Sequence, residues 1–76
     1  MLKLAAIILA YDLTIVPATP DVAGYVAFPP FQVLKTYQTE DACKADATKN
    51  GPAYLQEHGA PNNAPFRFAC NPVMGN

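Results

Sequence analysis

Residues 1–18 read MLKLAAIILAYDLTIVPA, and the interpretation of this apolar stretch decides what the rest of the chain can be. Lys3 followed by an apolar run, with small residues leading to Ala18, is typical of a secretory signal peptide. Two acidic residues depart from that pattern. Asp12 interrupts the apolar run, and Asp21 lies where a small residue would precede a later cut. The pattern therefore indicates an export signal by origin, with weakened cleavage.

Three interpretations of this stretch stay open. It is a cleaved or ancestral signal peptide, an uncleaved anchor on a membrane interface or a partner, or an ordinary core element. A membrane-spanning helix fits poorly, because about 16 residues at about 1.5 Å each reach roughly 24 Å, less than a hydrocarbon core of about 30 Å. We expect the uncleaved state, in which residues 1–18 form an apolar surface for a partner. Its candidate contacts are Leu4, Ile7 and Ile8.

The composition is unusually apolar for so short a chain. Of 76 residues, 51% are hydrophobic and only 14% are charged, and eight are prolines. A domain of this size buries only about 60% of its unfolded surface, so its core is marginal without a crosslink or a partner. Because prolines interrupt helices and sheets, we expect a largely extended chain whose contacts a partner supplies.

The net charge of -1 argues against a nucleic-acid partner. The basic residues beyond the first stretch are interleaved with acids, so they form no stripe that could neutralise a phosphate backbone.

The expected fold is small and irregular, a largely extended Pro-rich chain with one short helix and short strands. Its three regions are a leader-like apolar segment (1–18), a Pro-rich extended linker (19–30) and a small helix-plus-strand region (31–76). Alternation of side chains predicts strands at about 31–38 and 66–70.

The helix is expected at about residues 40–50. Thr39 is a candidate N-cap, and the two acids that follow it suit the positive end of a helix dipole. The tripeptide Asn50-Gly51-Pro52 predicts the end of the helix, because Gly suits a left-handed cap and Pro cannot continue the hydrogen bonding. A second short helix is predicted at 53–58.

The two cysteines, Cys43 and Cys70, predict a single disulfide between the helix and the last strand. It would close a loop of about 28 residues and contribute roughly 3 to 4 kcal/mol in the chain-entropy model. The alternative is a pair of buried free thiols in a reducing compartment. Two cysteines and one distant histidine do not have zinc-type spacing.

His58 is the only histidine, and no nucleophile or orienting acid is predicted beside it. A solvent-facing or capping histidine near a helix end is the simpler interpretation. Its alternative is ligation of a metal or of a magnesium-centred pigment. Serine is absent and no glycine-rich phosphate loop is present, so we do not expect an enzyme.

Aromatic side chains are numerous for the length of the chain. They either form the core or pack on a partner or a large apolar ligand. The candidates for partner contact are Tyr25, Phe28, Phe31, Phe66 and Phe68.

Two short motifs carry a resemblance to known proteins. At Asp41-Ala-Cys-Lys-Ala-Asp-Ala and at Phe68-Ala-Cys-Asn-Pro, the chain resembles short exported proteins common in alphaproteobacteria. These combine a leader, an alanine-rich helix that carries a cysteine, and a terminal strand that ends in Cys-x-Pro. The resemblance covers about residues 31–73, and it implies a location outside the cytoplasm rather than an activity.

In size and in its proline-rich apolar composition, the chain is also similar to the extra polypeptides of some purple-bacterial light-harvesting antennas. Those polypeptides lie as extended ribbons against a pigment-protein ring and bind additional bacteriochlorophyll. The similarity implies His58, with carboxylate, amide or backbone oxygens, as candidate magnesium ligands.

The function predicted first is a non-enzymatic accessory polypeptide, bound along a larger membrane-associated complex or at a membrane surface. A bacterial photosynthetic antenna is the most concrete example, with bacteriochlorophyll as a possible cofactor. The alternative is an exported periplasmic binding module, stapled by the disulfide, whose ligand is unknown.

Overall fold

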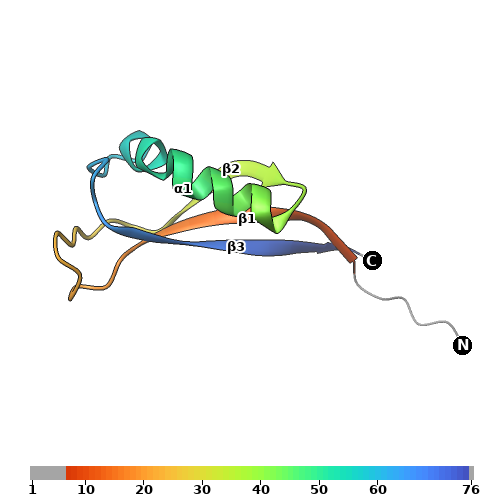
Figure 1. Ribbon diagram of the computed structural model, residues 1–76, viewed down its shortest axis with the longest axis horizontal. Coiled ribbons are helices and arrows are strands. Elements are labelled where there is room, and N and C mark those ends of the chain that lie inside the picture. Colours follow the sequence, from red (N-terminus) through yellow and green to blue (C-terminus); the bar gives the residue numbers. More distant parts are fainter. Residues whose placement is uncertain (1–6, 76) are drawn as a thin grey trace, which may run out of the picture.

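β1 (Ile7–Pro17) is the central strand of a three-stranded antiparallel sheet in the computed structural model, which describes residues 7–75. β2 (Phe31–Tyr37) and β3 (Phe66–Gly75) pair with its two edges. α1 (Glu40–Glu57) packs across one face of this sheet (Figure 1). Because β2 and β3 each run antiparallel to β1, they are parallel to one another, and α1 connects them.

This sheet overturns the expected irregular, largely extended chain. Strands account for 41% of the described residues, and seven of the eight prolines are placed where regular structure tolerates them, the exception being Pro52 inside α1. Five of the eight lie in connections, and Pro17 is the last residue of β1. Pro72 lies in the edge strand β3, where a missing backbone N–H is tolerated. The number of prolines misleads because their positions, not their count, decide whether a core can form.

The apolar N-terminal stretch provides the centre of the core. Leu13 and Ile15 are fully buried and join the same cluster as Leu55 of α1, while Thr14 between them is half-buried on the other face. This is the two-residue alternation of a strand that is covered on one side. A cut after Ala18 would remove β1, so cleavage at that site would destroy this sheet.

α1 is one continuous helix of 18 residues, so the predicted end at Asn50-Gly51-Pro52 and the separate second helix are wrong. Gly51 is not a left-handed cap, because the only positive-φ glycines among residues 7–75 are Gly24 and Gly59. Instead it is buried where the helix passes the ring of Phe66. Pro52 removes one backbone donor, but the helix continues to the fully buried Leu55, whose packing holds the final turns on the sheet.

Both ends of α1 are capped. The Thr39 hydroxyl accepts a hydrogen bond of 3.1 Å from the N–H of the third helical residue, which confirms the predicted N-cap. At the other end, Gly59 has a φ of +82° and donates to the Gln56 carbonyl, while Ala60 donates to the Leu55 carbonyl at 2.9 Å. These two bonds form a Schellman motif, so Gly59 and not Gly51 ends the helix.

β3 continues well beyond its predicted end at residue 70. Asn71 and Pro72 lie opposite Asp12 and Tyr11 of β1, and the strand reaches Gly75. Pairing with the long central strand outweighs the local signal of Asn-Pro, which on its own favours a turn. Across residues 7–75, no helix combines the length and the apolar character needed to cross a membrane.

The predicted disulfide is present and joins α1 to β3. The Cα atoms of Cys43 and Cys70 are 6.0 Å apart, and Cys43 is fully buried under the helix. The bond thereby ties the only helix of the described residues to an edge strand, next to Leu13 and the rest of the core.

Candidate functional site

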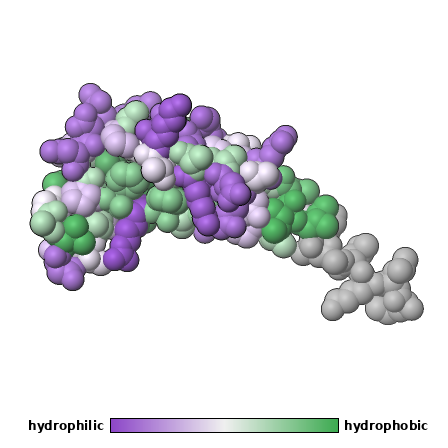
Figure 2. All heavy atoms as spheres, viewed as in Figure 1, coloured by the Kyte–Doolittle hydropathy of each residue, from purple (hydrophilic) through white to green (hydrophobic). Residues whose placement is uncertain are grey.

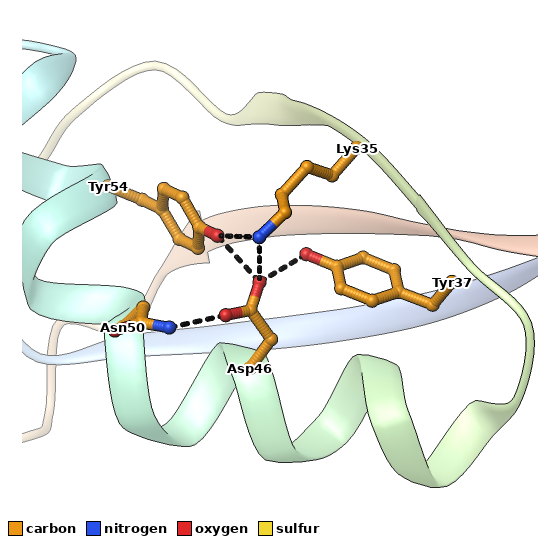
Figure 3. Close-up of polar contacts among 5 residues, drawn as sticks. All are labelled: Lys35, Tyr37, Asp46, Asn50 and Tyr54. Atoms are coloured by element: carbon orange, nitrogen blue, oxygen red, sulfur yellow. Dashed lines mark hydrogen bonds and ion pairs between the residues drawn. The ribbon is translucent and has the colours of Figure 1, made fainter.

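A partly buried carboxylate, that of Asp46, organises the polar contacts between α1 and β2 (Figure 3). Asp46 exposes 12% of its side chain and accepts hydrogen bonds from the hydroxyls of Tyr37 and Tyr54 and from the amide of Asn50. The Lys35 ammonium lies 3.7 Å from the same carboxylate and donates to the Tyr54 hydroxyl at 3.5 Å. We call these five residues the Asp46 network.

The Asp46 network shifts the pKa values of Asp46, Tyr37 and Lys35. Burial alone raises the pKa of Asp46, but the three hydrogen bonds and the Lys35 charge outweigh burial and lower this pKa from 3.8 to about 2. Burial and the bond to Asp46 raise the pKa of Tyr37 above its usual value. The hydrogen bond with Tyr54 and the Asp46 charge also raise the pKa of Lys35. At neutral pH, Asp46 is therefore an anion and Lys35 a cation.

The lowered pKa of Asp46 predicts a loss of stability in acid. Because its folded pKa of about 2 lies below the unfolded value of 3.8, its stabilising contribution is complete above about pH 4. That contribution is lost as the pH falls toward 2, and it amounts to about 2 kcal/mol. Urea unfolding between pH 6 and pH 2 should show this loss in the wild type and a weaker pH dependence in Asp46→Asn.

The matched control for this measurement is Asp41→Asn, which removes an exposed carboxylate from the first turn of the same helix. It should keep the acid dependence of the wild type. The same acid dependence in Asp46→Asn as in the wild type would contradict the role given to the Asp46 network.

A cavity of about 230 Å³ lies beside the Asp46 network, between β2 and the C-terminal half of α1. Its lining residues are Val33, Leu34, Lys35, Tyr54, Glu57 and His58. The register of β2 changes here, because Val33 pairs with Leu13 while Thr36 pairs with Asp12. Leu34 and Lys35 therefore have no partner on β1. Such an irregularity redirects side chains, and here it leaves Leu34 96% exposed while Lys35 contacts the helix.

His58 forms one wall of this cavity. Its ring stacks on Phe31, with centroids 3.8 Å apart and an interplanar angle of 11°, and the side chain is exposed at the end of α1. Phe31 in turn contacts Phe28, at 6.1 Å between centroids. Within residues 7–75, no group of three His, Cys, Asp or Glu side chains gathers that could hold a metal ion.

The predicted partner-contact residues differ in their exposure. Phe28, Phe31, Phe66 and Phe68 are half-buried and pack against the core cluster. Tyr25 is half-buried in the connection from β1 to β2. Ile7 and Ile8, in contrast, are about half-exposed, and Leu4 lies outside the described residues.

Ile7 and Ile8 belong to an apolar end of the molecule. β2 pairs with β1 only from Tyr11 to Ile15, whereas β3 pairs with β1 from Ile7 to Pro17, with one irregularity at Leu9. The first residues of β1 therefore extend past β2 with only the end of β3 beside them, as Figure 1 shows. Four large apolar side chains here are more than half-exposed, and they form a hydrophobic patch at one end of the surface in Figure 2. We call Ile7, Ile8, Leu9 and Met74 the apolar end.

The Asp46 network is the part of the site that is not expected from the sequence alone. The sequence nevertheless contains a pattern that points to it, because Asp46, Asn50 and Tyr54 follow one another at four-residue spacing along α1. Lys35 and Tyr37 likewise share one face of the predicted strand. What the sequence does not provide is the pairing of that helix face with that strand face, which depends on β1 lying between β2 and β3.

Comparison of the chain with protein-family models, with curated proteins and with solved structures finds no match.

Proposed function

We propose that the chain is a non-enzymatic accessory domain, stabilised by the Cys43–Cys70 disulfide outside the reducing cytoplasm, that attaches to a membrane surface through its apolar end. The observation that carries the proposal is the exposure of Ile7, Ile8, Leu9 and Met74, at 51 to 60% each. Exposed apolar side chains gathered in one place mark interaction surfaces. Structural disulfides form and persist mainly in oxidising compartments.

The geometry of the apolar end favours lipid over a second copy of the chain. Four side chains of this exposure offer on the order of 400 Å², so two copies meeting end to end would bury about 800 Å², less than a stable interface needs. Successive residues of a strand point to opposite faces, so Ile7 and Ile8 expose apolar surface on both sides of the ribbon. A fluid interface covers both sides at once, whereas a flat protein partner covers one.

The chemistry of the neighbouring sequence agrees with shallow attachment. The six residues before Ile7 are MLKLAA, apolar except for Lys3, and residues 71–76 have no charged side chain. The outer edges of a two-stranded ribbon keep unpaired backbone groups, which are unfavourable in the hydrocarbon core. We therefore place the apolar end among headgroups, at a depth of about 5 to 10 Å.

The similarity to antenna polypeptides rests on size and on proline-rich apolar composition. The described residues form a sheet covered by a helix, which differs from the extended ribbon of those polypeptides. Attachment at a membrane surface is the part of the sequence-based prediction that the proposal keeps, and His58 as a pigment ligand stays a prediction. The cavity that His58 lines, at about 230 Å³, is smaller than the pockets of about 300 to 1,000 Å³ that hold drug-sized ligands. A pigment would therefore have to bind on the surface.

Flotation with vesicles of phosphatidylcholine, with and without phosphatidylglycerol, tests the proposal. The wild type should float with both, and Ile8→Ser combined with Met74→Ser should weaken partitioning at least tenfold. Those two residues lie opposite one another at the apolar end, and each loses about 1 kcal/mol of apolar burial. Leu34→Ser is the matched control, because it removes a fully exposed leucine elsewhere on the surface.

Three outcomes would overturn the membrane proposal. They are absence of wild-type flotation, equal flotation of the double variant, and a concentration-dependent dimer in light scattering that the double variant abolishes. Thermal unfolding of each variant confirms that the fold is intact before flotation is compared.

A further inference from the structure

We infer that the cavity between β2 and α1 is a binding site for a free amino acid with an apolar side chain. This site lies away from the apolar end, so it goes beyond the proposed membrane attachment and fails or succeeds independently of it. The inference rests on the size of the cavity, on the mixed charges that line it and on the contacts that position Lys35, Tyr54 and His58.

The size of the cavity selects a small ligand. At about 230 Å³ it lies below the range of about 300 to 1,000 Å³ typical of sites for drug-sized molecules. A free amino acid such as leucine has a comparable bulk.

The lining of the cavity matches a zwitterion. Lys35 contributes an ammonium group and Glu57 a carboxylate, while Val33, Leu34 and the Tyr54 ring provide apolar surface. A ligand with only a carboxylate would pair with Lys35 but face the Glu57 charge without compensation. A ligand with only an amine would pair with Glu57 but face the Lys35 charge without compensation. An α-amino acid carries both charges, and its side chain can cover the apolar wall.

The Asp46 network holds the cationic side of the cavity in place. An ammonium group has three N–H donors, and the contacts of Lys35 with Tyr54 and Asp46 leave one of them for a ligand. Tyr54 is itself held by its 2.6 Å hydrogen bond to Asp46 (Figure 3). His58 is fixed against Phe31. Side chains that are already ordered lose little entropy when a ligand binds.

Amide chemical shifts of ¹⁵N-labelled protein, measured during titration with three matched probes, test this inference. The probes are leucine, 4-methylpentanoate, which lacks the amine, and 3-methylbutylamine, which lacks the carboxylate. We expect saturable shifts with leucine in the millimolar range, centred on Val33, Leu34 and Tyr54. Each truncated probe should bind about two- to fivefold more weakly, because it lacks one of the two ion pairs that leucine can form with the exposed Lys35 and Glu57.

Two variants separate the roles of the charges. Glu57→Gln should remove the preference for leucine over 4-methylpentanoate, and Lys35→Met should remove its preference over 3-methylbutylamine. Lys35→Met also changes the Asp46 network, so its effect on binding could come from altered folding. Glu57→Gln avoids this problem, because the Glu57 side chain makes no hydrogen bond or ion pair among residues 7–75. Lys44→Met removes an exposed lysine paired with Glu40 and is the matched control. Equal binding of all three probes, or no saturable shift, would overturn the inference.

Discussion

Replacing Cys43 and Cys70 with alanine lowers the free energy of unfolding by about 3 to 4 kcal/mol, the largest effect expected in this chain. The disulfide joins residues 27 apart in the sequence, and a loop of this length restricts the unfolded chain by about that amount. Domains of this size have little stability to spare, often about 3 to 5 kcal/mol from the core alone. Most of the variant should therefore be unfolded or close to its midpoint at 37 °C.

Urea and thermal unfolding of the oxidised wild type and the double variant measure this effect. Reduction of the wild type should reproduce it. Alkylation of protein from its native host, before and after reduction, reports the state of the thiols there. Free thiols in that sample, or a double variant as stable as the wild type, would contradict a structural disulfide in an oxidising compartment.

Local signals in the sequence locate several parts of the fold. Thr39 and the two acids after it mark the start of α1, and alternation marks β2 as close to its observed bounds. The pair of cysteines in a small apolar chain indicates the disulfide. Each of these features depends on residues near one another in sequence, or on a single pairing that has no competitor.

The parts that the sequence does not reveal depend on distant pairing. The alternation of Asp12, Leu13, Thr14 and Ile15 is a strand signal, but it lies inside an apolar run that also fits an export signal. Its central position arises from β3, whose Ala69 lies opposite Thr14. The Asp46 network and the cavity follow from the same arrangement, because they form only once α1 has crossed from β2 to β3.

The second large effect is a reversal of the usual consequence of replacing glycine with alanine in a helix. In most helix interiors this substitution is stabilising by about 1 kcal/mol. At Gly51 a Cβ atom would lie 2.9 Å from one carbon of the Phe66 ring and closer still to another. The ring packs against the core, so it must move or the helix must separate from β3. We expect Gly51→Ala to lower the free energy of unfolding by about 2 to 3 kcal/mol, as overpacking does.

A double-mutant cycle identifies the ring as the cause. In a Phe66→Ala background the obstacle is gone, so Gly51→Ala should become neutral or stabilising there, with a coupling of at least about 2 kcal/mol. Ala45→Gly, at an exposed position of the same helix, measures the ordinary difference in helix propensity between alanine and glycine. It should lower the free energy of unfolding by about 1 kcal/mol. Stabilisation by Gly51→Ala in the wild-type background would show that the approach of α1 to β3 is looser than described. The position of Cys43 over Cys70, and with it the register of the helix on the sheet, would then need a different explanation.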